Sequence, residues 1–130
     1  MKPIEINIDI DGTVFTHDYP NIGHDIGAVP VLKALTNNGH KLIIFTMRDG
    51  KELQEAVDWF GQNDIPVYGV QSNPTQKRWT KSPKSYAQLM IDDSALGCPL
   101  KFDEKLSTRL FVDWEKVKEM LIGMKLINEE

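Results

Sequence analysis

The sequence predicts a single α/β domain over residues 1–130, built of three layers with a mostly parallel sheet between helices and no added cap domain. Three observations lead to this prediction. A chain of 130 residues suits one compact domain with a single core. Short apolar segments alternate with segments of helical periodicity, which is typical of βαβ units. Polar side chains follow three of the apolar segments, at Asp9, Thr46 and Asp92, as expected where parallel strands end.

The first half of the chain predicts two strands and two helices. Alternating isoleucines indicate a strand over residues 4–10, and the apolar segment 41–45 is typical of a buried parallel strand. The helix between them begins near Pro30, a favoured first-turn residue, and ends at the Asn-Asn-Gly sequence before the second strand. A second helix follows Asp49, which we expect to cap it together with Glu52 in a capping box.

The second half predicts shorter elements. Three segments indicate strands: residues 67–70, 86–91 and 110–112. We expect residues 71–84 and 97–106 to be mostly irregular. A last helix, capped by Asp113, is expected to bury an apolar face made of Val117, Met120, Leu121 and Met124.

Composition and charge exclude several classes of protein. The net charge of −4 does not indicate a basic surface for nucleic acid or membranes. A single cysteine, Cys98, excludes an internal disulfide and a cysteine-rich zinc site. No apolar segment approaches the length that spans a membrane, and no secretory leader is visible. We therefore expect a cytoplasmic enzyme or binding domain.

One feature of the first strand is unusual for a central parallel strand, which normally has apolar residues on both faces. Glu5 and Asn7 lie on the same face as Asp9. That face is thinly covered, or the two side chains find polar partners, or a neighbouring subunit covers it.

The segment Asp9-Ile10-Asp11-Gly12-Thr13 carries the strongest chemical signal. Its two carboxylates are two residues apart on a strand and point the same way. Like charges this close raise each other's pKa unless a cation lies between them. The Gly and Thr that follow turn the chain and bring backbone N–H groups near the carboxylates. Together these groups suit a divalent cation and a phosphate.

The chain resembles the haloacid dehalogenase superfamily of aspartate-nucleophile phosphatases, which have a Rossmann-like fold. Four features carry the resemblance in the family's order: Asp9-Ile10-Asp11-Gly12-Thr13, Phe45-Thr46, a lysine before the fourth strand, and Ile91-Asp92-Asp93. Chance produces the first of these in a chain of this length about once in a thousand sequences. The resemblance covers residues 4 to 97, and the short spacings leave no room for an inserted cap domain.

The resemblance implies a reaction through an aspartyl-phosphate. Asp9 would attack phosphorus, and Asp11 would protonate the leaving oxygen and then activate the hydrolytic water. Mg²⁺ would be held by Asp9, the backbone carbonyl of Asp11 and Asp92. Asp93 would orient a metal-bound water, and Thr46 would donate a hydrogen bond to the phosphoryl group.

The remaining phosphate contacts are also implied by the resemblance. Backbone N–H groups near Ile10, Asp11 and Met47 would hold the phosphoryl oxygens, and Gly12, Thr13 and Met47 would be substrate-binding residues. The neutralising lysine would be Lys84, with Lys81 and then Lys77 as alternatives. Arg48 either clamps a second anionic group of the substrate or forms an ion pair on a helix surface.

The sequence therefore predicts a Mg²⁺-dependent phosphatase with an open active site, acting on a small phosphorylated substrate. Two alternatives remain: a nucleic-acid end-processing phosphatase and a non-catalytic phosphate-binding module. The first draws on a basic segment with one aromatic residue: Lys77, Arg78, Trp79, Lys81 and Lys84. A lid from a neighbouring subunit of a homo-oligomer would also fit the open site. The loop residues His17, Asp18 and Tyr19 are candidates for specificity.

Overall fold

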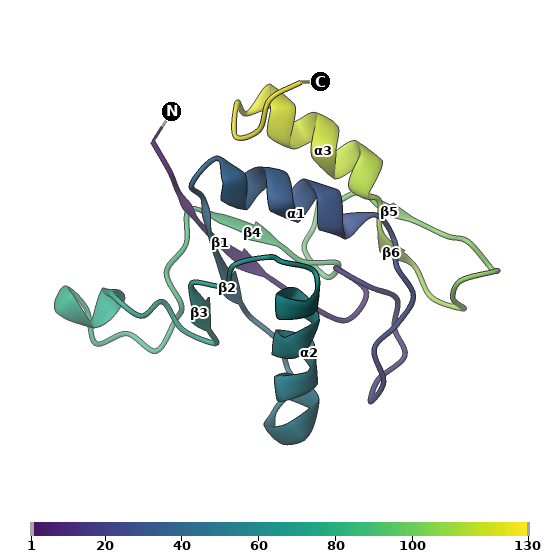
Figure 1. Cartoon of the computed structure of the whole chain (residues 1–130), viewed down its shortest axis with the longest axis horizontal. Coiled ribbons are helices and arrows are strands. Elements are labelled where there is room, and N and C mark those ends of the chain that lie inside the picture. The colour runs from purple at the N-terminus through teal and green to yellow at the C-terminus, as the bar shows by residue number, and fades with distance from the viewer. Residues whose placement is uncertain (1, 130) are drawn as a thin grey trace.

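The computed structural model describes residues 2–129, and its centre is a four-stranded parallel sheet in the order β3-β2-β1-β4 (Figure 1). The strands are β1 Glu5–Ile8, β2 Lys41–Ile44, β3 Gly69–Val70 and β4 Leu89–Ile91. Each strand pairs in parallel with its neighbour. The predicted α/β fold is confirmed, and residues 2–129 contain no additional cap domain.

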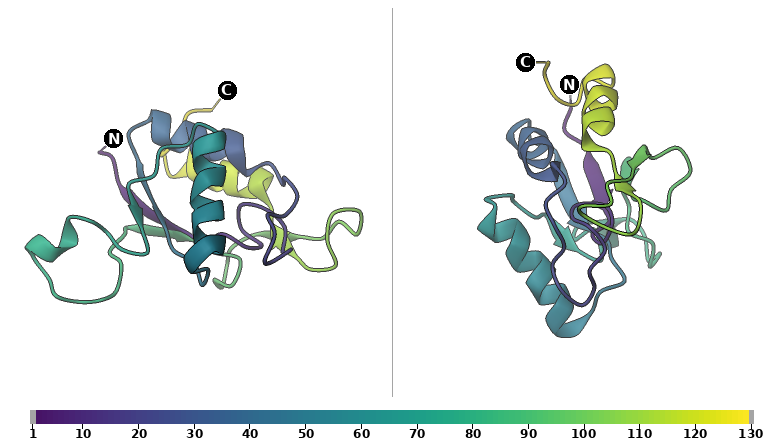
Figure 2. Two further views of the ribbon diagram at one scale, coloured as in Figure 1. Left: turned by 60° about the horizontal axis from the view of Figure 1, so that its bottom comes forward. Right: turned by 90° about the vertical axis from the view of Figure 1, so that its right-hand side faces the viewer.

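Three α-helices, one short 3-10 helix and a β-hairpin complete the domain. The helices are α1 Ala28–Asn37, α2 Gly50–Gln62, α3 Trp114–Gly123 and the 3-10 helix η1 Gln76–Arg78. Strands β5 Leu100–Lys101 and β6 Phe111–Val112 pair antiparallel. Figures 1 and 2 show that this hairpin and η1 lie on opposite sides of the molecule.

One face of the sheet carries the apolar core. Alternate residues of the two central strands, Ile6, Ile8, Leu42 and Ile44, are fully buried on this face. They form one cluster with the inner faces of all three α-helices, among them Leu32, Phe60 and Leu121. Burying one such aliphatic or aromatic side chain stabilises the fold by about 1.5–3 kcal/mol, so this layer holds the helices to the sheet.

The opposite face is covered by the segment 72–88, which includes η1, and the contacts are polar. The Asn7 amide donates to the Ser85 carbonyl at 3.0 Å and accepts from the Ser85 hydroxyl at 3.0 Å. The Asn73 amide donates to the Glu5 carboxylate at 3.1 Å. Of the three explanations for the polar face of the first strand, the structure supports polar partners within the chain.

The predicted helix caps are confirmed only in part. Asp113 precedes α3, and its side chain accepts a hydrogen bond from the Lys116 N–H at 3.2 Å. Asp49 precedes α2 as predicted, but its side chain accepts no capping hydrogen bond. The capping box with Glu52 was therefore wrong. The end of α1 is confirmed, because Gly39 follows it with a left-handed φ of +88° that glycine adopts without strain.

Other differences concern the second half of the chain. Strand β4 is shorter than predicted, and β5 lies in a segment that we expected to be irregular. Val117 and Leu121 of α3 are buried as predicted, but Met120 and Met124 are 50% and 46% exposed. Met120 and Met124 instead line an open apolar groove beside β4, at the edge of the sheet, where no further layer covers them.

The strand order decides where a site can form. The chain passes from β1 outward to β2 and β3, and then returns to place β4 on the other side of β1. In open α/β sheets, ligands bind at the carboxyl ends of the strands where the direction of strand order reverses. Here that place is the carboxyl end of β1, where Asp9 lies.

Candidate active site

The register of the sheet places two acidic residues side by side at its carboxyl edge. Ile8 of β1 pairs with Ile91 of β4, and the Asp9 N–H donates to the Ile91 carbonyl at 3.0 Å. Asp9 and Asp92 therefore follow paired residues on adjacent strands, and their side chains leave the sheet on the same face. The predicted convergence of strand ends is confirmed for these two residues.

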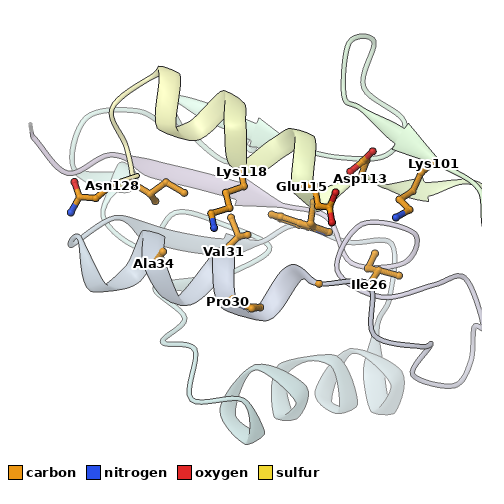
Figure 3. A pocket seen from close by; sticks show the side chains of 12 residues that line it. Ile26, Pro30, Val31, Ala34, Lys101, Asp113, Glu115, Lys118 and Asn128 are labelled. Carbon is orange, nitrogen blue, oxygen red and sulfur yellow. The ribbon is translucent and has the colours of Figure 1, made fainter. Parts of the chain in front are cut away.

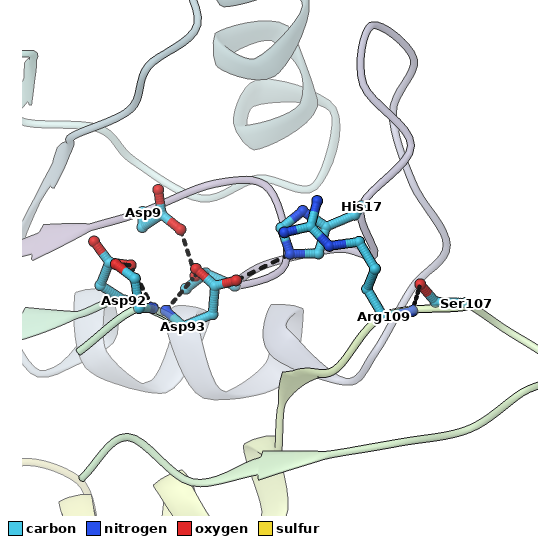
Figure 4. A network of polar contacts seen from close by, with 8 residues as sticks. Asp9, His17, Asp92, Asp93, Ser107 and Arg109 are labelled. Atoms are coloured by element: carbon cyan, nitrogen blue, oxygen red, sulfur yellow. Dashed lines mark hydrogen bonds and ion pairs between the residues drawn. The ribbon is translucent and has the colours of Figure 1, made fainter. Parts of the chain in front are cut away.

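Asp93 completes an acidic cluster with Asp9 and Asp92 (Figure 4). One carboxylate oxygen from each residue lies within 4.8 Å of the other two, and all three residues are partly buried. Oxygen atoms are the ligands that hard divalent cations prefer, and three like charges this close repel one another without a cation among them. The chemistry of these donors therefore fits a divalent metal ion.

The environment of Asp9 disfavours its charged form. Burial raises the pKa of the Asp9 carboxyl from 3.8 to about 7. The hydrogen bond from the Thr13 hydroxyl lowers this pKa, whereas the neighbouring Asp92 and Asp93 raise it. Within residues 2–129, no lysine, arginine or histidine forms an ion pair with Asp9 or Asp92. A divalent cation at the cluster is one source of the positive charge that these carboxylates lack.

Hydrogen bonds hold the three carboxylates in place. The Thr13 hydroxyl donates to Asp9 Oδ2 at 2.6 Å, and its oxygen accepts from the Asp93 N–H at 3.0 Å. Asp92 Oδ1 accepts from the Ser94 N–H and hydroxyl at 2.9 and 2.8 Å. Thr13 is fully buried, so it links the end of β1 to the end of β4 from beneath the site. The cluster is thus pre-organised by side chains that follow both strands.

Asp93 has a second partner, the imidazole of His17. Nε2 of His17 lies 3.0 Å from Asp93 Oδ2, and the two side chains are 17% and 19% exposed. Gly12 packs against this pair with a φ of +79°, and a Cβ atom there would collide with the His17 ring and the Asp93 carboxylate. The glycine is therefore required for two reasons, its left-handed backbone and the lack of space.

Asp11 does not join the acidic cluster and instead binds Arg48 through both carboxylate oxygens. Arg48 Nε donates to Asp11 Oδ2 at 2.8 Å, and Nη2 donates to Oδ1 at 2.7 Å. This contact is the main cause that raises the pKa of Arg48. A forked pair of this kind fixes both the position and the plane of the carboxylate. Asp11 is therefore held beside Asp9 in one orientation.

The other donors of Arg48 are also in use, and the residue is only 2% exposed. Its remaining N–H groups donate to three backbone carbonyls, those of Pro20, Asn21 and Glu52, at 3.4, 2.7 and 3.2 Å. A guanidinium has five donors, so none is left to bind a substrate anion. Of the two interpretations of Arg48, the structure supports an ion pair, and Arg48 is buried between the loop after β1 and the first turn of α2 instead of lying on a helix surface.

Thr46 and Met47 follow β2 at the same edge of the sheet. The Thr46 hydroxyl accepts from the Arg48 N–H at 3.1 Å. Gln71, at the end of β3, accepts from the Thr46 N–H at 2.9 Å and donates to the Thr46 carbonyl at 2.6 Å. The Met47 side chain is 98% exposed. Gln71 was not identified from the sequence, although its place directly after a strand was a usable signal.

The lysines of the segment 77–84 have no ion-pair contact with the acidic cluster in the described residues. Lys77, Lys81 and Lys84 are exposed, and none forms an ion pair within residues 2–129. Lys84 contributes its backbone carbonyl to a hydrogen bond from the Gln76 amide at 2.8 Å. The choice among the three lysines thus stays a prediction.

A separate cavity of about 300 Å³ lies between α1 and α3 (Figure 3). Its walls include Val31 and Ala34 of α1 and Trp114 and Lys118 of α3. None of the three clustered aspartates lines it. The candidate site is therefore the acidic cluster at the sheet edge and not this cavity.

Comparison with known proteins gives one informative match. The structure of a conserved protein from Bacteroides thetaiotaomicron is 32% identical in sequence, and the alignment covers 95% of this chain and 93% of that one, with a TM-score of 0.74. No family model matches the chain, and no curated protein matches it. Within residues 2–129, no helix is long and apolar enough to cross a membrane.

Proposed function

This chain belongs to the same protein family as the conserved Bacteroides thetaiotaomicron protein, and from its acidic site we propose that it is a Mg²⁺-dependent phosphatase. It would hydrolyse a phosphomonoester through an aspartyl-phosphate on Asp9. In this proposal the chain is a single capless domain of the haloacid dehalogenase-like superfamily. The residues that carry that resemblance, Asp9, Thr46 and Asp92, follow three neighbouring strands of the sheet.

The observation that carries the proposal is the cluster of three carboxylates at the switch point of the sheet, where Asp9 has no basic partner among residues 2–129. A purely structural acidic cluster would be expected to recruit a lysine or arginine, as Asp11 recruits Arg48. Asp9 also has a pKa raised to about 7, which is typical of groups in functional sites. Both features support a site that takes up a cation and an anionic substrate together.

Asp9 and Asp11 would divide the chemistry between them. A carboxylate oxygen of Asp9 attacks phosphorus, and the bond from phosphorus to the leaving oxygen breaks. Asp11 gives that oxygen the proton that it gained in the preceding turnover, and it gains a proton again when it deprotonates the water that hydrolyses the aspartyl-phosphate. Because both Asp11 oxygens accept from Arg48, Asp11 must release one of these hydrogen bonds to reach the substrate. When that hydrogen bond to Arg48 forms again, Asp11 returns to the orientation seen in the structure.

The metal ligands would be Asp9, the backbone carbonyl of Asp11 and Asp92, with Asp93 beside them. Mg²⁺, when bound, neutralises part of the charge of the phosphoryl group and of the carboxylates. The loops around Gly12, Thr13 and Met47 would supply N–H groups, and the Thr46 hydroxyl would donate to a phosphoryl oxygen. Lys84 would neutralise further charge from the exposed segment before β4.

Hydrolysis of an aryl phosphate tests the proposal. We expect turnover that requires Mg²⁺, stops with a chelator and is abolished in Asp9→Asn. Asp58→Asn, which changes an exposed aspartate of α2, is the matched control and should retain turnover. Turnover in Asp9→Asn equal to that of the wild type would reject Asp9 as the nucleophile.

A second candidate function, the processing of nucleic-acid ends, draws on the segment with η1. Trp79 is 63% exposed and packs edge-to-face on Tyr86, with ring centroids 5.2 Å apart. Exposed Lys77, Arg78 and Lys81 lie in the same segment. Such a surface would bind a labelled oligonucleotide with an affinity that falls steeply with salt. No binding at low salt would remove this candidate and leave small phosphomonoesters as the substrate class.

A further inference from the structure

The loop between β1 and α1, residues 12–27, is called the flap below. It is built as a narrow hairpin, in which the Thr16 N–H donates to the His24 carbonyl at 3.1 Å and the Thr16 hydroxyl accepts from the His24 N–H at 2.8 Å. His17 is the first residue beyond this pairing. The position of its side chain is therefore set by the hairpin and not by the strands that carry the acidic cluster.

The flap contacts the site at two separate points. On one side, its Pro20 and Asn21 carbonyls accept hydrogen bonds from Arg48, which also holds Asp11. On the other side, His17 contacts Asp93 Oδ2 at 3.0 Å, and Figure 4 shows the imidazole directed at that carboxylate. The first contact combines these backbone carbonyls with the rings of Phe15 and Tyr19, over which the Arg48 guanidinium lies at 5.5 and 5.2 Å. The second contact depends on the His17 side chain alone.

The contact between His17 and Asp93 decides which way the Asp93 carboxylate faces. Its Oδ2 is taken by His17, and its Oδ1 is left facing Thr13 and Asp9, with the Thr13 oxygen 3.4 Å away. A carboxylate with one oxygen bound in this way loses rotational freedom and presents the other oxygen in a fixed direction. Partners of this kind commonly change metal affinity by about 10–100-fold.

We propose that His17 is a positioning residue for the cation site: its hydrogen bond to Asp93 orients that carboxylate toward Asp9 and Asp92, and so ties cation binding to the docked position of the flap. This inference rests on the proposed function only in that a divalent cation binds at the cluster. It does not depend on the reaction or on the substrate. His17 donates through Nε2–H, since an ionised carboxylate only accepts.

Titration of the protein with Mg²⁺ in the absence of substrate tests the inference. Mg²⁺ binding is measured in two ways, by calorimetry and by the rise in melting temperature that Mg²⁺ causes. We expect His17→Ala to weaken Mg²⁺ binding about tenfold, which lowers the stabilisation at saturating Mg²⁺ by about 1.4 kcal/mol. His17→Gln keeps an N–H donor and should restore most of the affinity. His24→Ala is the matched control, because it removes an exposed histidine of the same flap and should bind as the wild type does.

A double-mutant cycle separates positioning from general damage to the flap. In an Asp93→Asn background, His17→Ala should weaken Mg²⁺ binding no further, because the carboxylate that it orients is gone. Equal binding by wild type and His17→Ala would overturn the inference, as would an equal loss in His17→Gln and His17→Ala. Wild-type protein that binds no Mg²⁺ at all would instead overturn the cation site, and with it the proposed function.

Discussion

Replacing Asp9 with asparagine is expected to stabilise the metal-free protein, and to do so much more at pH 8 than at pH 4. Burial raises the pKa of Asp9 from 3.8 to about 7, so the folded protein holds a proton on this carboxyl that the unfolded chain releases. Stability therefore falls as the pH rises from 3.8 to about 7, and remains low above that. Asparagine carries no charge at any of these pH values and removes this loss.

The size of the effect follows from the two pKa values. The difference between 3.8 and about 7 corresponds to a ceiling of about 4 kcal/mol, at about 1.36 kcal/mol for each pKa unit. Asp9 is partly open to solvent, which screens its neighbours, so we expect about half of that ceiling, ~2 kcal/mol. At pH 4 the wild type and the variant should differ little, since Asp9 is then mostly protonated in the folded state.

Urea denaturation of the wild type and Asp9→Asn at several pH values, in the presence of a chelator, measures this difference. Asp18→Asn controls for the general loss of one negative charge from the same part of the chain. Adding Mg²⁺ at pH 8 should stabilise the wild type more than Asp9→Asn, because the ion compensates the charge that the variant lacks. A difference between wild type and Asp9→Asn that is the same at pH 4 and pH 8 would refute the reasoning.

Two further predictions concern residues that shape the site. Arg48→Lys should destabilise the protein by about 3–5 kcal/mol in urea denaturation, because Asp11 loses its forked partner inside the protein. Arg109→Lys, which changes an exposed arginine, is the control. Equal destabilisation by both substitutions would contradict the structural role of the buried Arg48–Asp11 pair. Gly12→Ala should lower stability by about 1–3 kcal/mol and weaken Mg²⁺ binding, since its φ is +79° and a Cβ has no space. Gly61→Ala, in open space on α2, is the control and should raise stability by about 0.5–1 kcal/mol. A Gly12→Ala protein with the stability and Mg²⁺ affinity of the wild type would refute the packing argument.

The part of the site that the sequence predicted well is the part that the strands determine. Alternating isoleucines indicated the first strand, and parallel strands share one carboxyl edge, so the sequence predicted that Asp9 and Asp92 lie at the same edge of the sheet. That β4 pairs directly with β1 came from the structure. The helices could be located because their buried residues repeat with the helical period: Ala56 and Phe60 of α2 lie one turn apart and are both buried.

The parts that were missed depend on the path of loops. Arg48 is buried because carbonyls of two different segments, Asn21 and Glu52, turn toward it, and no local pattern encodes that meeting. His17 contacts a carboxylate that lies 76 positions away in the chain. Met120 has the spacing of a buried face but lines the open groove beside β4, so periodicity alone could not reveal its exposure.

The central claim is that Asp9 carries the phosphoryl group during turnover. The most direct measurement is mass spectrometry of peptides from protein mixed with Mg²⁺ and an aryl phosphate and quenched in acid. Asp11→Asn is the form to use, because without its proton-transferring group the hydrolysis of the aspartyl-phosphate is slowed and the intermediate accumulates. The account predicts one added phosphoryl group on the peptide that contains Asp9, and none after Asp9→Asn. Turnover by the wild type with an unmodified Asp9, or with the phosphoryl group on another residue, would contradict it.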